Sequence, residues 1–329
     1  MRILVTGSAG HLGEALVRTL RADGHAVLGL DQVASACTDR VGSIADPAVV
    51  RAAVEGVDAV LHAATLHKPH IATHTRQDFI DTNVTGTLNL LDAAVDAGVR
   101  AFVFTSTTSS FGDAMTPPPG APAAWITEDT VPQPKNIYGA TKLAAEDLCR
   151  LAHRNQKLPC LILRTSRFFP EADDQPASRE AFVDANLKLN EFLHRRVAIE
   201  DAVEAHRCAI ERAPALGFGR YIISATTPFR REDAALLRRD PAAAMDRRVP
   251  GWRASYEALG WRMAPSLDRV YDNALAREAL DWRPREDFAT VLARVQGGGE
   301  VLGPMARRLG IKGYHGAAYR DGRYPVEGA

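Results

Sequence analysis

Residues 1–16 read MRILVTGSAGHLGEAL, and this stretch decides the fold. Residues 2–6 form a short apolar run rich in β-branched side chains, and apolar residues then recur with helical spacing between residues 12 and 20. A strand, a turn containing three glycines and a helix therefore follow one another directly. No Gly-Lys-Ser/Thr triplet follows the turn, which disfavours a P-loop.

The three glycines have the spacing of a dinucleotide-binding turn. In a strand-to-helix turn Gly7 permits the tight bend, Gly10 lets the backbone approach a pyrophosphate, and Gly13 lets the helix pack close to the strand. Free N–H groups at the helix N-terminus would bind the phosphates. The alternative is a glycine turn that binds nothing, and the rest of the chain has to decide between the two.

An acidic residue follows at the distance that this kind of turn requires. The predicted strand 26–31 ends in Asp31, 18 residues after Gly13. Its carboxylate can accept hydrogen bonds from both ribose hydroxyls of an adenosine and would repel a 2′-phosphate. Gln32 comes next and no arginine lies beside it, so the sequence favours NAD over NADP.

Composition narrows the class of partner. The chain has 329 residues, with 40 basic and 40 acidic side chains and hence no net charge, so bulk electrostatics indicates neither a nucleic-acid nor a membrane partner. The four cysteines lack metal-binding spacing, no apolar run reaches membrane-spanning length, and the N-terminus does not resemble a signal peptide. We therefore expect a cytoplasmic protein with a small-molecule partner.

Strand-like and helix-like segments alternate along the first half of the chain. The predicted strands cover 2–6, 26–31, 58–62, 101–106 and 159–164, and the predicted helices cover 12–22, 47–54, 77–97 and 138–154. This order predicts βαβ units and a parallel sheet covered on both faces. The expected fold is a Rossmann-type, doubly wound α/β domain with a smaller C-terminal lobe that binds the substrate.

The second half of the chain is organised differently. Two long loops, 115–125 and 170–180, interrupt the pattern and are expected to be functional. Beyond them we predict a strand and then a helix within 195–213, a strand at 219–225, and short helices at 254–259 and 274–280. The predicted units are an NAD-binding domain at 1–168, a substrate-binding lobe interleaved with the sheet at 169–296, and a tail at 297–329 that lies on the body or on a neighbour.

Candidate catalytic groups follow the fourth predicted strand. Tyr138 and Lys142 lie four residues apart at a helix start, hence on one face. An adjacent ammonium and an oxidised nicotinamide would both lower the pKa of a phenol. The strand 101–106 runs into the hydroxyl residues of 105–110, which would emerge at the mouth of an α/β crevice. Without the hydroxyl residues and the glycine turn, the simpler interpretation of Tyr138 and Lys142 would be a surface tyrosine and lysine on an ordinary helix.

Together these features resemble the extended short-chain dehydrogenase/reductase superfamily, in its branch of sugar epimerases and dehydratases. LHAATLH at 61–67, DTNVTGTLNLLDAA at 81–94 and YDNALAREALDWRP at 271–284 are similar to further segments of that family. The resemblance covers residues 1–165 well and 195–290 loosely. It implies hydride transfer between NAD and a secondary alcohol carbon, and a homodimer formed through the helices 77–97 and 138–154.

The resemblance also assigns roles to individual residues. Thr107 would hydrogen-bond the reacting oxygen of the substrate, Tyr138 would move its proton, and Lys142 would bind the nicotinamide ribose and tune Tyr138. The predicted cofactor-binding residues are Gly7, Gly10, His11, Leu12, Gly13, Asp31, Gln32, Ser43, Ile44, Ala63, Ala64, Asn83, Thr105, Tyr138, Lys142 and Ser166. The predicted substrate-binding residues are His67, Lys68, His70, Thr107, Thr108, Ser109, Arg167 and Arg179.

Departures from the family pattern narrow the reaction. Family dehydratases carry an Asp-Glu pair directly after the catalytic threonine, where this chain has Thr108 and Ser109, so we predict no dehydratase activity. The stretch RTSRFFP at 164–170 resembles uronate dehydrogenase, and Arg179 could then bind a substrate carboxylate. The segment 282–284 and the tail resemble the epimerases instead. Net oxidation of a free sugar acid and internal epimerisation of a nucleotide sugar therefore both remain open.

Other interpretations carry less weight. Four histidines between residues 62 and 74 could suggest zinc, but no cysteine or acidic ligand accompanies them, so we predict no metal site. A protein that senses NAD without turnover would not need Thr107, Tyr138 and Lys142 together. A reductase of small carbonyl compounds would usually take NADP, against which Asp31 argues.

Overall fold

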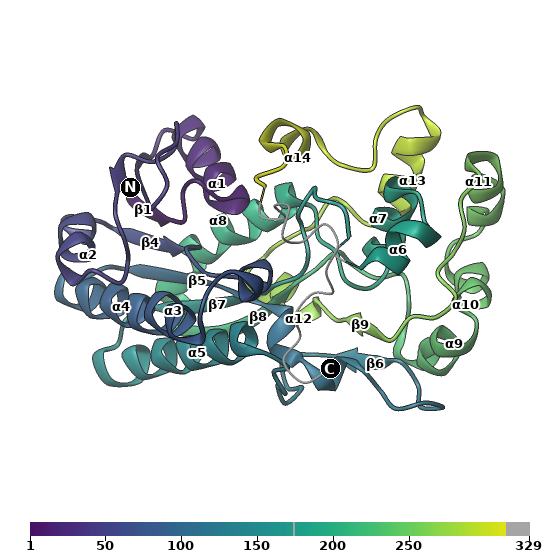
Figure 1. Ribbon diagram of the computed structural model, residues 1–329, viewed down its shortest axis with the longest axis horizontal. Helices are drawn as coiled ribbons and strands as arrows, with labels where there is room; N and C mark the ends of the chain where they lie inside the picture. Colours follow the sequence, from purple (N-terminus) through teal and green to yellow (C-terminus); the bar gives the residue numbers. More distant parts are fainter. Residues whose placement is uncertain (174, 314–329) are drawn as a thin grey trace.

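The computed structural model describes residues 1–173 and 175–313, and a seven-stranded parallel sheet forms its centre (Figure 1). The strand order is β3-β2-β1-β4-β5-β7-β8, the doubly wound arrangement in which the order reverses between β1 and β4. The strands are β1 (Arg2–Thr6), β2 (Ala26–Asp31), β3 (Arg40–Val41), β4 (Ala59–His62), β5 (Ala101–Thr107), β7 (Cys160–Thr165) and β8 (Phe218–Ile223). The predicted Rossmann-type α/β fold is confirmed.

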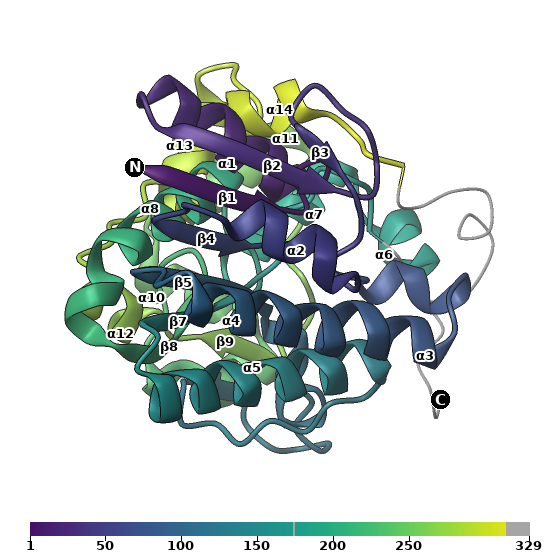
Figure 2. The ribbon, with the colours of Figure 1, turned by 90° about the vertical axis from the view of Figure 1, so that its left-hand side faces the viewer.

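Helices cover both faces of this sheet (Figure 2). One face packs against α1 (His11–Ala22) and α8 (Ile199–Leu216). The other packs against α2 (Pro47–Val54), α4 (Gly86–Asp96) and α5 (Ile137–Gln156). Because strand side chains alternate between faces, Ile3 and Val5 join the first core while Leu4 joins the second.

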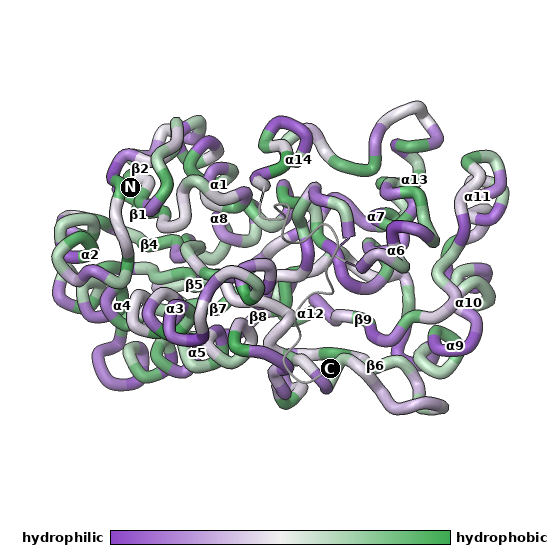
Figure 3. The backbone as a smooth tube through the Cα atoms, in the orientation of Figure 1, coloured by the Kyte–Doolittle hydropathy of each residue, from purple (hydrophilic) through white to green (hydrophobic). Residues whose placement is uncertain are grey.

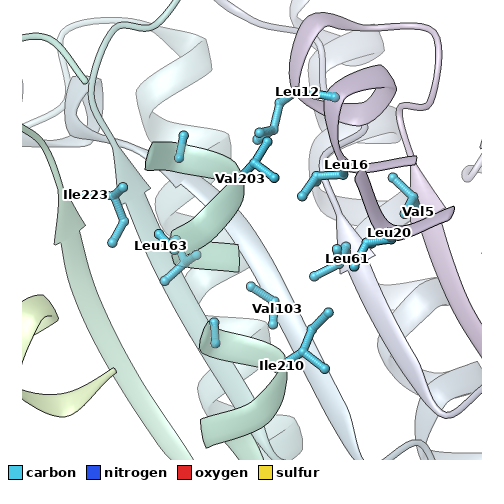
Figure 4. Packing of buried hydrophobic residues seen from close by; sticks show 14 of the residues in the cluster. Val5, Leu12, Leu16, Leu20, Leu61, Val103, Leu163, Val203, Ile210 and Ile223 are labelled. Atoms are coloured by element: carbon cyan, nitrogen blue, oxygen red, sulfur yellow. The ribbon is translucent and has the colours of Figure 1, made fainter. Parts of the chain in front are cut away.

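The central strands are apolar at nearly every position because each face of the sheet is covered by helices, so that side chains pointing either way are buried. In β5, Val103 points toward α1 and α8, whereas Phe102 and Phe104 point toward the opposite helices. Figure 4 shows Val103 with Leu16 and Ile210 in the first of these cores. Figure 3 shows hydrophobic colouring along β4 and β5. A sheet buried on both faces requires this pattern, which distinguishes it from the alternating pattern of a half-exposed sheet.

A smaller lobe sits beyond the carboxyl edge of the sheet and has its own hydrophobic core. Its two strands, β6 (Ala124–Ile126) and β9 (Arg269–Tyr271), pair in parallel. Its helices are α6 (Pro176–Ala181), α7 (Asp184–Phe192), α9 (Ala234–Arg239), α10 (Pro241–Arg248), α11 (Trp252–Leu259) and α13 (Phe288–Gln296). Although α8, β8 and the helix α12 (Ala274–Ala279) lie within the range predicted for this lobe, they pack with the main α/β layers.

Three segments differ from the sequence prediction. The single helix expected at 77–97 is divided into α3 (Arg76–Phe79), a π-helical turn at Ile80–Thr85 and α4. The strand expected before α8 is reduced to one bridge between Arg167 and Arg196. The loop 170–180 contains the start of α6, and the loop 115–125 ends in β6. Short strands and tightly turned helices depend on tertiary partners, which a local pattern does not contain.

The described part of the predicted tail lies on the body. The helix α14 (Pro304–Leu309) packs against α1 and α8, and Lys312 follows it. Residues 314–329 of that predicted segment lie outside the described residues. Within 1–173 and 175–313, no helix combines the length and apolarity needed to cross a membrane.

Candidate active site

A cavity of about 750 Å³ opens at the carboxyl edge of the sheet and extends to β9 of the smaller lobe. Residues at or just beyond the ends of β1, β2, β4, β5 and β7 line it. This is where ligands bind in open α/β sheets, because the reversal of strand order leaves a crevice there. The cavity joins the glycine turn to the hydroxyl end of β5 in one continuous space.

The glycine turn has the geometry of a phosphate cradle. Gly7 has φ +74°, a left-handed conformation that favours glycine, and a Cβ there would lie 2.7 Å from the Ala64 nitrogen. The Gly10 N–H donates to the Gly7 carbonyl at 3.0 Å, which closes the turn directly before α1 begins. Gly10 caps α1 without a side-chain hydrogen bond, so the helix N-terminus is suited to receive an anion.

Asp31 lies at the end of β2 and lines the cavity, as predicted. Its Oδ2 accepts from the Ala9 N–H and its Oδ1 from the Val33 N–H, both at 2.9 Å. These bonds hold the carboxylate against the glycine turn, while each oxygen keeps a lone pair for a ribose hydroxyl. Ser43 was predicted beside it but does not line the cavity, because its hydroxyl faces Gln32 and the Ala45 N–H.

Asn83 also lies outside the cavity lining, although it was predicted to bind cofactor. Its side chain accepts from the Leu66 N–H at 2.8 Å and donates to the Leu66 carbonyl at 2.9 Å and to the Thr141 hydroxyl at 3.0 Å. Leu66 does line the cavity. Asn83 is therefore a positioning residue, which joins the π-helical turn, the cavity wall after β4 and the helix α5.

The predicted catalytic residues come from two neighbouring elements. Thr107 ends β5, and Tyr138 lies in the first turn of α5, whose N-cap Asn136 accepts from the Gly139 N–H. Both line the cavity, and the Thr107 hydroxyl lies within hydrogen-bonding reach of the Tyr138 phenol. Burial raises the pKa of Tyr138 to about 12, against a smaller lowering by Thr107, so the phenol is protonated at neutral pH.

Lys142 lies one helical turn from Tyr138 but behind the cavity wall. Its Nζ sits 4.0 Å from the centroid of the Phe104 ring, and the side chain is buried. Burial lowers the pKa of Lys142 to about 7. Lys142 was predicted to bind the cofactor, but it does not line the cavity, because its side chain is buried against the Phe104 ring.

The structure brings most of the predicted site residues to one cavity. Those that line it are Gly7, Gly10, His11, Leu12, Gly13, Asp31, Gln32, Ile44, Ala63, Ala64, His67, Lys68, His70, Thr105, Thr107, Thr108, Ser109, Tyr138, Ser166 and Arg167. Arg179 does not line the cavity. It lies in α6, and its guanidinium donates a hydrogen bond of 2.6 Å to the Asp173 carbonyl. The position predicted to bind a substrate carboxylate is thus occupied in holding the loop before α6.

Sequence reasoning missed several cavity residues. Phe169, Arg195, Arg269, Tyr271 and Lys312 all line the cavity. Arg195 is placed at the cavity by the neighbouring bridge between Arg167, after β7, and Arg196, after α7. A single bridge between distant segments produces no local sequence pattern. The alternation in the stretch RVY at 269–271 could have indicated a strand with two residues on one face.

The chain closes over the start of α1 with a segment from its far end. His11 Nε2 lies 3.0 Å from the Gly310 carbonyl and 3.1 Å from Glu171 Oε1. The same Oε1 accepts from the Lys312 N–H at 3.1 Å, and Lys312 Nζ pairs with Glu14. Burial alone would raise the pKa of Glu171, but His11 and the Lys312 N–H together lower it below its ordinary value. We call residues 310–312 the C-terminal strap.

The histidines after β4 have different surroundings from one another. His62 is fully buried, with its Nδ1 2.8 Å from the Thr6 hydroxyl and its Nε2 2.9 Å from the Thr87 hydroxyl. Burial lowers its pKa well below the ordinary value, and Lys142 lowers it further. His67 and His70 line the cavity. Among the residues that the structure describes, no three His, Cys, Asp or Glu side chains are grouped so that they could hold a metal ion.

Comparisons with known proteins agree with this geometry. The model of the NAD dependent epimerase/dehydratase family matches residues 3–221. The chain is 33% identical over 174 residues to a UDP-glucose 4-epimerase of Lactobacillus helveticus, covering 50% of this chain and 51% of the relative. It is 36% identical over 226 residues to a 2-alkyl-3-oxoalkanoate reductase of Stenotrophomonas maltophilia, covering 64% of this chain and 66% of the relative. The chain thus spans about half the length of the epimerase that it matches.

Solved structures are similar over almost the whole chain, and one of them contains NAD. It is a short-chain dehydrogenase/reductase superfamily protein from Agrobacterium tumefaciens with bound NAD, at 25% identity and a TM-score of 0.65. The match covers 94% of this chain and 97% of that one. The predicted use of NAD is in accord with the bound cofactor of this neighbour and with the family model.

Proposed function

The chain belongs to the NAD-dependent epimerase/dehydratase family, and from this premise we propose that it transfers a hydride at a secondary alcohol carbon of a sugar or nucleotide sugar. The observation that carries the proposal is the continuous cavity. It joins a cradle for a dinucleotide, at Gly7 and Asp31, to a paired hydroxyl and phenol, at Thr107 and Tyr138. A purely NAD-binding sensor would have no use for the second pair.

The cradle assigns the parts of NAD to residues. The turn between Gly7 and Gly13 would hold the pyrophosphate, and Asp31 would accept the adenosine ribose hydroxyls. When bound, NAD supplies the hydride acceptor or donor. Thr107 would orient the substrate oxygen, and Tyr138 would take or return its proton. Lys142, one helical turn from Tyr138, would favour the phenolate in its ammonium form. We also propose that the protein works in the cytoplasm.

The cavity residues beside Thr107 do not support a water-elimination reaction. Thr108 and Ser109 line the cavity beside Thr107 and bring no carboxyl group. Within the described part of the chain, the acidic residues of the lining are Asp31, at the adenosine end, and Asp173, which is paired with Arg195. The proposal is therefore simple oxidoreduction, or oxidation followed by re-reduction as in an epimerase, without dehydration.

A substrate panel tests this proposal. NAD-loaded protein is mixed with free aldoses, free uronates and nucleotide sugars, and both reduced-nicotinamide absorbance and sugar products are measured. We expect turnover of at least one member, either as net NADH or as an epimer without net NADH, and no 4-keto-6-deoxy sugar. Tyr138→Phe serves as the control that should lose the signal. Absence of product from every member with the wild-type protein would contradict the proposal.

The C-terminal strap provides a second test. Glu171→Gln removes the charge that holds His11 and Lys312 together over the start of α1, and charge-assisted hydrogen bonds contribute about 1.5–3 kcal/mol. We expect NAD to dissociate about tenfold faster, as measured by stopped-flow displacement. The matched control is Glu300→Gln, since Glu300 forms an exposed pair with Arg307 and its loss should leave the rate unchanged. Equal dissociation rates in the two variants would show that the strap does not retain the cofactor.

We further propose a homodimer formed through α4 and α5. These helices lie side by side on one face of the sheet (Figure 2). Large apolar side chains of this layer are exposed, with Leu88 on α4 and Leu151 on α5 each at 41%. Burying these two leucines against a second copy would remove their apolar surface from water.

A further inference from the structure

One cavity wall comes from the smaller lobe and carries a positive charge. In β9, side chains alternate, so that Val270 enters the core of the lobe while Arg269 and Tyr271 line the cavity. The pairing of β9 with β6 fixes this orientation, since Arg269 is in register with Ala124 and Tyr271 with Ile126. A strand rather than a flexible loop thus presents the arginine.

The bonds of Arg269 leave most of its guanidinium available. Its Nε donates to the Tyr271 hydroxyl at 3.1 Å, and that hydroxyl donates to the Met115 sulfur at 3.0 Å. Among residues 1–173 and 175–313, no carboxylate lies within 4.0 Å of the Arg269 guanidinium. Its Nη1 and Nη2 groups form no hydrogen bond with any of those residues. As far as the described residues go, the side chain is held through Nε, and no carboxylate neutralises its charge.

A second arginine of the same wall differs in this respect. Arg195 pairs with Glu191 at 2.6 Å and with Asp173 at 2.8 Å. These acids tie Arg195 to the protein, whereas the partners of Arg269 within the described residues are neutral. The charges of both arginines also reach the buried His194, whose pKa is lowered well below its ordinary value by burial first and then by Arg195 and Arg269, against an opposite effect of Glu191.

We propose that the substrate carries an anionic group, a carboxylate or a phosphate, and that Arg269 binds it through Nη1 and Nη2. This inference rests on the proposed function and specifies its substrate class. A planar guanidinium with two free N–H-bearing nitrogens matches two oxygens of such a group in a bidentate pair. The anion would be anchored at β9 while the alcohol carbon lies at Thr107 and Tyr138, so binding at one end orients the reacting end. The structure thereby moves the anion-binding role from Arg179 to Arg269.

The test measures binding to the NAD-loaded protein by titration calorimetry. The anionic probes are D-galacturonate, D-glucuronate and UDP-glucose, and the neutral probes are D-galactose and D-glucose. We expect at least one anionic probe to bind more tightly than its neutral counterpart, and Arg269→Gln to weaken that binding by about 10- to 100-fold. Arg269→Lys should retain part of the affinity, because it keeps the charge but loses the bidentate geometry. The matched control is Arg253→Gln, on the outer helix α11, which should not change binding.

The outcomes separate this inference from the proposed function. Dependence on Arg269 for uronates identifies a carboxylate, and dependence for UDP-glucose alone identifies a phosphate. Failure of every anionic probe to bind, or equal binding by wild type and a folded Arg269→Gln variant, would overturn the inference. Turnover of a neutral sugar that needs Tyr138 but not Arg269 would likewise overturn it while leaving the proposed function intact. Arg269-dependent binding of an anionic probe without turnover of any probe would support the inference and count against the proposed function.

Discussion

Tyr138→Phe is expected to slow hydride transfer by about 10²- to 10⁴-fold, the range that a positioned general acid or base contributes. The substitution removes only the hydroxyl, which lies within reach of Thr107, and retains the ring in its buried place at the start of α5. Because burial raises the pKa of Tyr138 to about 12, the proton is held on the phenol until the reaction requires its transfer. Single-turnover measurements of NADH formation or consumption would give the rate.

A matched control separates loss of the proton from loss of packing. Phe111→Leu changes an aromatic residue that is fully buried near the same edge but does not line the cavity. It should reduce stability with little effect on the rate of the folded enzyme. The expectation for Tyr138 would be wrong if the phenylalanine variant bound NAD normally and reacted within a few-fold of wild type.

Gly13→Val is expected to weaken NAD binding by at least about 100-fold, since the turn would have to open to admit the side chain. A Cβ at this position would collide with the Gly7 carbonyl oxygen and would lie 2.5 Å from the Gly7 carbonyl carbon and 2.9 Å from Ser8 Cα. All three are backbone atoms of the phosphate cradle, so no side-chain rotation relieves the contact. Calorimetric titration with NAD measures the effect directly.

The control for this variant is Gly24→Ala, beyond the end of α1. Gly24 has φ +82°, but nothing lies within 4 Å of a Cβ placed there. The substitution should therefore cost about 1–2 kcal/mol of stability through backbone strain and leave NAD affinity unchanged. Wild-type affinity in Gly13→Val would show that the turn does not hold the cofactor.

The core of the α/β domain could be predicted from sequence because it depends on local patterns. Continuous apolar strands and amphipathic helices are visible in the chain, and the glycine turn together with Asp31 indicates the cofactor edge. Ser43 shows the limit of this reasoning, since Gly42 and Ile44 on either side of it line the cavity. Neighbouring residues in such a segment face in different directions, one toward the cavity and the next toward the protein. The sequence spacing does not show which residue faces the cavity.

The substrate wall could not be predicted, because it is made by contacts between distant segments. Arg269 reaches the cavity only because β9 pairs with β6, a strand more than a hundred residues earlier. Asn83 was expected at the cofactor, yet the π-helical turn directs its amide to the Leu66 backbone and to Thr141. Such positions are decided by tertiary pairing rather than by local propensity.

The C-terminal strap has a consequence for the order in which the protein is built. His11 and Gly310 are 299 positions apart, so a growing polypeptide can make the contact between them only after residue 310 has been synthesised. The glycine turn and the neighbouring strands can assemble while most of the chain is still being synthesised. The contact of the strap with the start of α1 has to wait until residues 310–312 have left the ribosome. A nascent chain that ends before these residues presents the start of α1 without that cover.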